Sequence, residues 1–241
     1  REFGDRALHP DTVIIMAGNP VDQAAGGQGL SLPMLGRVTK IKIRPTIGEV
    51  QAYLYQLGPE GSTLRSLATD YAATLENAPD LLAIDPPPGA QQSERPWASP
   101  RAIERAARLA SQLLDDGTPD TSPIFGAALA GNLGEDAAGA YLAIRKVREN
   151  LPSTKDVVSN PETARLPGDT QTGIAVLGII AQAALADPAA AWVYLDRMVD
   201  GEIKIAAFRV LARVPFKGEG PWKAKGSKAR VKVMGAMGAA L

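Results

Sequence analysis

From residue 46 to about residue 215 the sequence is a succession of helix-length segments separated by short breakers, which restricts the fold to a mainly helical one. Thr46, Ser62 and Ser99 each stand where an N-cap would open such a segment, and Pro100 fits the first helical position after Ser99. The expected helices cover residues 47–57, segments opened by residues 62 and 99, and residues 124–132, 135–150, 171–186 and 189–199, with a last helix beginning near residue 203. Helix is therefore expected to predominate.

Two strand patterns precede this helical region. Val13–Ala17 is a continuous apolar run, typical of a strand that is covered on both faces near the centre of an α/β sheet. Val38–Ile43 alternates, which is typical of a half-buried strand nearer a sheet edge. We therefore expect an α/β element before residue 46.

The composition excludes several classes of site. The 241 residues include 26 basic and 26 acidic side chains, one His and no Cys. Without cysteine there is no disulfide framework, no thiolate metal site and no cysteine nucleophile, which fits a reducing, cytoplasmic compartment. The longest apolar stretch, residues 173–186, is shorter than the roughly 20 residues of a membrane span, so no membrane contact is expected. Because the chain starts with Arg1 and its first Met is Met16, we expect it to be part of a longer protein.

Three short motifs carry candidate functional residues. Asn19 follows the first strand pattern in Ala17-Gly18-Asn19-Pro20, a position just beyond the carboxyl edge of a sheet, where α/β proteins bind ligands. Arg37 ends Leu32-Pro33-Met34-Leu35-Gly36-Arg37, directly before the second strand pattern. Arg101 follows the helix start Ser99-Pro100. Each motif also has a simpler interpretation: a loop start for Asn19, a polar cap for Arg37 and a solvated arginine behind an N-cap for Arg101.

The order of these motifs, with a Gly-rich loop between the first two, resembles the second half of an AAA+ ATPase core, closest to the MoxR-like and dynein-related branches. The resemblance covers most of residues 1–215, and Pro96-Trp97 and Leu133-Gly134 with Glu135 are also similar to this group. It implies the C-terminal part of an α/β core at residues 1–45 and a helical lid with additional helices at residues 46–215. Residues 216–241 remain as a basic, flexible tail.

The same resemblance implies a function. Asn19 would be sensor 1, Arg37 the arginine finger and Arg101 sensor 2. The complete protein would bind ATP and Mg²⁺, hydrolyse ATP as a homo-oligomeric ring, expected to be a hexamer, and remodel a protein client, with a von Willebrand factor A domain protein as a partner. Phosphoryl transfer depends on an aligned water and on positive charge at the phosphates, so Asn19 and Arg101 would act within one subunit and Arg37 on its neighbour.

The sequence also departs from the family pattern. The family has Asp or Asn before the finger and Phe after it, whereas this chain has Gly36 and Val38. No Gly-x-x-x-x-Gly-Lys-Ser/Thr occurs, and no apolar strand ends in paired acids, so both Walker elements are missing from the sequence. We therefore expect this chain alone neither to bind ATP tightly nor to hydrolyse it.

The alternative is a non-enzymatic helical interaction or adaptor module. For such a module the basic tail is a candidate nucleic-acid-binding segment. After Phe216 the chain has six Lys or Arg residues and one acid, Glu219, with Trp222 available to stack on a base. Because the whole chain is neutral and carries no nucleic-acid fold signature, a solvated tail is the favoured interpretation.

Overall fold

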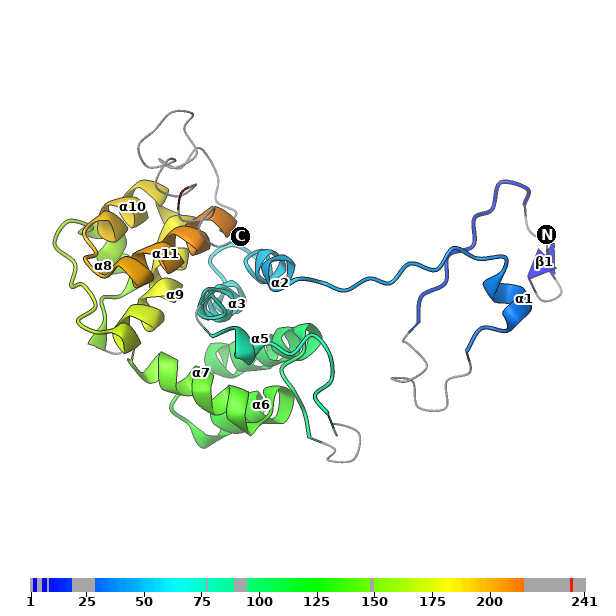
Figure 1. Ribbon diagram of the computed structural model, residues 1–241. Helices are drawn as coiled ribbons and strands as arrows, with labels where there is room; N and C mark the ends of the chain where they lie inside the picture. Colours follow the sequence, from blue (N-terminus) through cyan, green and yellow to red (C-terminus); the bar gives the residue numbers. More distant parts are fainter. Residues whose placement is uncertain are drawn as a thin grey trace. The chain divides into compact units, whose positions relative to one another are not determined.

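The structure is a computed structural model that describes residues 2–3, 6–7, 9–18, 29–76, 78–88, 95–147, 150–214 and 235 (Figure 1). The chain divides into two compact units, residues 1–43 and residues 44–241. Each unit is treated by itself. Asn19, and all of the tail 216–241 except Gly235, lie outside the described residues.

The first unit contains little regular structure among its described residues. Strand β1 (Glu2–Phe3) pairs antiparallel with β2 (Arg6–Ala7), and the short helix α1 spans Leu32–Leu35. The expectation that Val13–Ala17 and Val38–Ile43 form strands is not met. A strand needs a hydrogen-bonded neighbour for its backbone groups, and neither run has one among the described residues. The structure therefore does not show an α/β core here.

The second unit is helical. Its elements are α2 (Ile47–Leu54), α3 (Thr63–Thr74), a 3₁₀ turn η2 (Pro79–Leu81), α5 (Pro100–Asp115), α6 (Pro123–Leu133), α7 (Glu135–Val147), α8 (Thr154–Ser159), α9 (Thr170–Ala186), α10 (Pro188–Asp196) and α11 (Gly201–Arg213). The prediction of a mainly helical chain is confirmed. Helix α8 was not predicted, although Ser153 and Asp156 form a capping box at its start.

The expected caps explain where several helices begin and end. The Ser62 hydroxyl accepts a hydrogen bond from the backbone N–H of Arg65 at the start of α3. Thr46 and Glu49 form a capping box at α2. Helix α2 ends at Leu54, three residues earlier than expected, because the Arg65 guanidinium donates to the carbonyl oxygens of Tyr55, Gln56 and Gly58 and holds them in a turn. Gly58 has a φ of 84°, which glycine adopts without strain.

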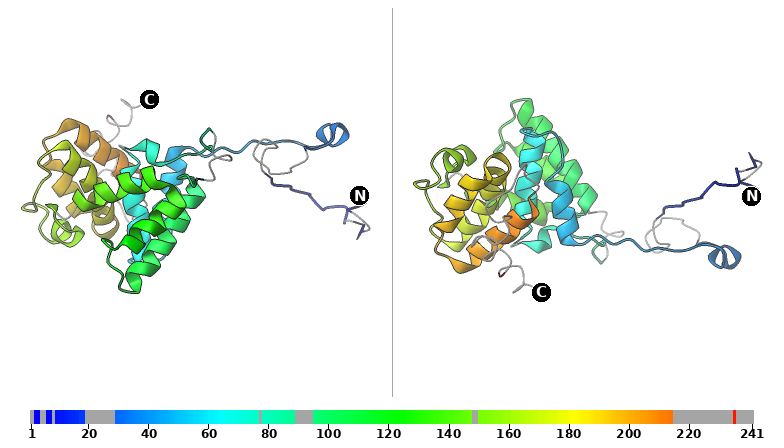
Figure 2. Two further views of the ribbon diagram at one scale, coloured as in Figure 1. Left: turned by 90° about the horizontal axis from the view of Figure 1, so that it is seen from below. Right: turned by 90° about the horizontal axis from the view of Figure 1, so that it is seen from above.

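Helix α9 lies at the centre of the helical unit and contacts α3, α7, α8, α10 and α11. In Figure 2 the green helices α5, α6 and α7 form one side, and the helices α8 to α11, coloured from yellow-green to orange, form the other, with α3 between them. Helices α9 and α11 pack closely because residue 173 of α9 has no side chain: a Cβ on Gly173 would lie 2.6 Å from Cγ1 of Ile203 in α11. None of the helices that the structure describes is both long and apolar enough to cross a membrane.

Candidate functional site

Arg101 is the second residue of α5, and the local sequence places it there. The Ser99 hydroxyl accepts a hydrogen bond of 3.2 Å from the backbone N–H of Ala102, and Pro100 is the first helical residue, as predicted. The helix buries Ile103 and Ala106 on its inner face, so the side chain of Arg101 is exposed. Among the described residues, none forms an ion pair or hydrogen bond with the Arg101 guanidinium. Within the part of the chain that the structure describes, the group is therefore open to an anion.

The segment before α5 is held by backbone contacts. The N–H of Ala83 donates to the carbonyl oxygen of Ala98 at 2.8 Å, and the N–H of Ser99 donates to that of Trp97 at 2.7 Å. The carbonyl oxygen of Pro96 lies so close to Gly134 that a Cβ on this glycine would be 2.7 Å from it. The two motifs around Pro96 and Gly134, far apart in sequence, are therefore in contact.

An exposed polar contact holds α5 against α2. Glu104 accepts a hydrogen bond of 2.7 Å from the Tyr53 hydroxyl in α2 and one of 2.9 Å from Arg108 one turn later. The hydrogen bond from Tyr53 is the main reason that the pKa of Glu104 is lowered, and the same bond raises the pKa of Tyr53. This contact ties α5 to α2 near Arg101.

Arg37 belongs to the first unit, where it follows α1 and is exposed. Its Nη1 donates to the carbonyl oxygen of Pro33 at 3.1 Å, a contact within the same turn of chain. This contact uses one donor of the guanidinium, and no other partner of the group lies among the described residues. Arg37 and Arg101 lie in different units, and Asn19 lies outside the described residues.

A buried ionic cluster in the helical unit was missed by sequence reasoning. Asp70 of α3, 2% exposed, accepts hydrogen bonds from the Tyr141 hydroxyl at 2.9 Å and from Arg145 at 3.1 Å. Arg145 also donates to Asp120 at 2.8 Å. Burial is the main cause of the raised pKa of Tyr141, with the Asp70 charge second. Because its carboxylate is already paired, Asp70 is not a free base.

A second cluster joins the first and last helices of the unit. Glu76, with a side chain 4% exposed, is paired with Arg213 of α11, whose Nη1 also donates to Oε1 of Gln51 in α2 at 2.5 Å. Arg209 Nε lies 3.8 Å from the same carboxylate. The first cluster joins α3 and α7 to the loop before α6, and the second joins α2 and α11 to the turn after α3. Because their charges are paired, both clusters indicate a role in holding the helices together rather than in chemistry.

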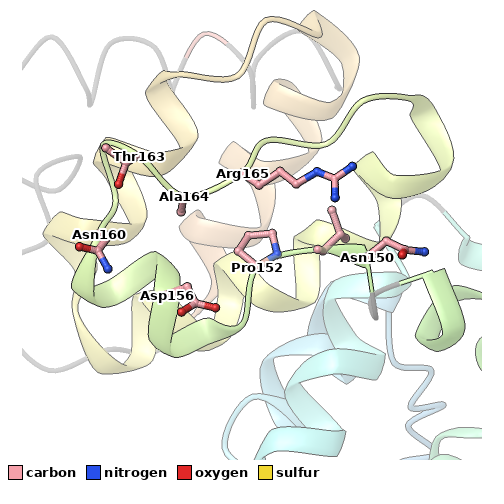
Figure 3. A pocket seen from close by; sticks show the side chains of 8 residues that line it. Asn150, Pro152, Asp156, Asn160, Thr163, Ala164 and Arg165 are labelled. Carbon is pink, nitrogen blue, oxygen red and sulfur yellow. The ribbon is translucent and has the colours of Figure 1, made fainter.

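An open pocket of about 500 Å³ lies beside α8 (Figure 3). It is lined by Asn150, Leu151, Pro152, Asp156, Asn160, Thr163, Ala164 and Arg165, none of which belongs to the predicted motifs. Asp156 accepts hydrogen bonds from the N–H and hydroxyl of Ser153, which lower its pKa and use the carboxylate to cap α8. The part of the chain that the structure describes has no group of three or more His, Asp or Glu side chains able to hold a metal ion. The described residues therefore do not fit a Mg²⁺ site.

No family model, curated protein or solved structure matches this chain.

Proposed function

We propose that this chain is the C-terminal part of an AAA+ ATPase of the MoxR-like or dynein-related branch, with residues 46–215 as its helical lid. The observation that carries the proposal is the presentation of Arg101, exposed and without a partner among the described residues, on the capped first turn of α5. The guanidinium of Arg101 is planar and permanently charged, which suits binding to phosphate oxygens. Arg101 would therefore bind the ATP phosphates as sensor 2. The complete protein would bind Mg²⁺ through segments outside this chain.

Exposed apolar residues in the first unit give independent support. Val13 is 79% exposed, Ile14 51%, Ile15 88% and Met16 55%. A contiguous apolar stretch of this kind marks a surface that another element covers. In the proposed complete protein, residues 13–17 and 38–43 become strands of the α/β core, which places Asn19 as sensor 1 and Arg37 as a finger towards the neighbouring subunit. The assembly would be a cytoplasmic ring, proposed to be a hexamer, that remodels a protein client with a von Willebrand factor A domain protein as partner.

The proposal is tested on the complete protein, obtained from the reading frame that contains this chain. We expect that frame to encode a P-loop upstream of Arg1. Arg101→Ala should lower ATP turnover on the order of a hundredfold, because a preorganised positive charge at the phosphates is lost. Its melting temperature should hardly change, because the side chain is exposed.

Arg105→Ala is the matched control, since Arg105 is exposed on the same helix one turn later. This variant should keep normal turnover. A frame without a P-loop would overturn the proposal and favour the helical adaptor module. Normal turnover in Arg101→Ala, or an equal loss in both variants, would remove the sensor role of Arg101.

A further inference from the structure

We propose that Gly134 is a positioning residue for Arg101, acting through the carbonyl group of Pro96. The inference rests on the proposed function of Arg101 for its consequence in catalysis. Its geometric part, the coupling of the α6–α7 junction to the start of α5, stands on contacts within the helical unit alone.

The backbone of Gly134 is held by hydrogen bonds to the helix before it and to the helix after it. Its N–H donates to the carbonyl oxygen of Ala130 at 2.9 Å and closes α6, and its own carbonyl accepts from the N–H of Ala138 at 3.0 Å and opens α7. Its φ is 85°, in the region that glycine prefers. Because two helices meet at this one residue, its backbone has little freedom to move away from a neighbour.

Pro96 is the neighbour, and the chain between it and Arg101 is short and stiff. Proline restricts φ at positions 96 and 100, and Ala98, 4% exposed, is held by the N–H of Ala83. Ser99 then caps α5. A displacement of the Pro96 carbonyl is therefore passed to Ser99 and to the first turn of α5, where Arg101 lies.

The consequence is a mechanical link between the α6–α7 pair and Arg101. The oxygen of Pro96 is in contact with a residue that has no side chain, and any side chain there must push it away, since a Cβ would lie 2.7 Å from it. A misplacement of about 1 Å is enough to cost on the order of a hundredfold in rate when it moves a group that acts in the transition state.

The first test uses this chain and the matched pair Gly134→Ala and Gly117→Ala. Gly117 has the same φ of 85°, but nothing lies within 4 Å of a Cβ placed there, so its variant has a side chain at the same φ without a contact on Pro96. Gly134 also has a ψ of 156°, which strains an alanine there, and Pro96→Gly, which leaves Gly134 in place, separates this strain from the contact. Trp97 is made the only reporter by Trp192→Phe and Trp222→Phe. We expect the Trp97 emission maximum to shift in Gly134→Ala and to stay unchanged in Gly117→Ala. Equal spectra for the two variants would overturn the coupling.

The second test uses the complete protein and measures kcat and KM for ATP. Gly134→Ala should lower kcat on the order of tenfold to a hundredfold, with a much smaller change in KM, while Gly117→Ala should not. In an Arg101→Ala background, Gly134→Ala should cause no further loss. An equal further loss in that background would mean that Gly134 acts by a route other than Arg101, and would overturn the proposal.

The two tests distinguish failure of the proposed function of Arg101 from failure of the coupling between Gly134 and Arg101. If Arg101→Ala itself leaves kcat unchanged, the proposed function of Arg101 fails, and the Trp97 emission still decides whether the coupling exists. If Gly134→Ala does not fold, Pro96→Gly loosens the same contact from the other side and leaves Gly134 in place. It should lower kcat in the unmodified background and not in the Arg101→Ala background.

Discussion

The hydroxyl of Tyr141 in α7 donates a 2.9 Å hydrogen bond to the buried carboxylate of Asp70 in α3, 71 residues earlier in the chain. Arg145, one turn after Tyr141, neutralises the same carboxylate and reaches Asp120 in the loop before α6. Three parts of the helical unit thus depend on one carboxylate. Removing the partner of a buried ion lowers the stability of the fold strongly, whereas removing the partner of an exposed ion has little effect.

Asp70→Ala should therefore lower the free energy of unfolding by about 3 kcal/mol, because Arg145 and the Tyr141 hydroxyl lose a buried partner. Asp120→Ala removes the other partner of Arg145, but Asp120 has a side chain 45% exposed and should cost less than about 1 kcal/mol. Urea denaturation of the two variants measures the difference. Equal losses would contradict the view that Asp70 is the anchor of the cluster.

Alkaline pH should destabilise the chain through its tyrosines. Burial is the main cause of a raised pKa in Tyr55, Tyr71, Tyr141 and Tyr194, and it raises the pKa of Tyr194 to about 12. In the unfolded chain a tyrosine ionises near pH 10, so the unfolded state releases its protons first. The stabilising contribution is therefore fully present below about pH 10 and is lost as the pH rises from there towards 12.

Urea denaturation between about pH 9 and about pH 11 should show this loss, with tyrosinate absorbance rising together with unfolding. Tyr194→Phe should make the free energy of unfolding less dependent on pH, because it removes one of the buried tyrosines that ionise. Tyrosinate absorbance that rises near pH 10 while the helices remain folded would contradict the raised pKa values.

Arg37 is predicted to act on the neighbouring subunit of the complete protein. Arg37→Ala should keep nucleotide binding and lose turnover, since the charge is removed from a different subunit's site. Mixing this variant with one that lacks its own Walker B acid should restore part of the activity, because some interfaces would then pair an intact pocket with an intact finger. Activity no greater than the weighted sum of the two variants would instead make Arg37 a polar cap, as its contact with the Pro33 carbonyl allows.

Local signals in the sequence predicted the helical unit well. Ser62 and Ser99 do cap α3 and α5, because an N-cap depends only on residues within one turn. The run Val13–Ala17 failed as a strand for the opposite reason: a strand depends on neighbours elsewhere in the fold. Helix α8 was missed because its six residues are too few for a helical period, although Ser153-x-x-Asp156 was a usable capping signal.

Contacts between distant residues were beyond sequence reasoning. Nothing near Asp70 in the sequence indicates that Arg145 will neutralise it. The sequence shows the motifs around Pro96 and Gly134, but the contact between them follows from the packing of α5 and α6 and could not be deduced from either motif. Of the predicted site, only the exposed position of Arg101 followed from local rules.

The pairing of Arg213 with Gln51 and Glu76 has a consequence for the topology of the helical unit. Because Arg213 at the end of α11 is bonded to Gln51 of α2, the polypeptide enters and leaves this unit at adjacent points. Gly48 lies so close that a Cβ on it would be 3.9 Å from Arg213 Nε. A domain with adjacent ends can be inserted into a surface loop of a host protein, or circularly permuted by a short linker, without unravelling its core. Residues 46 to 214 can therefore be joined to another protein at both ends without a connection that passes through the helical core.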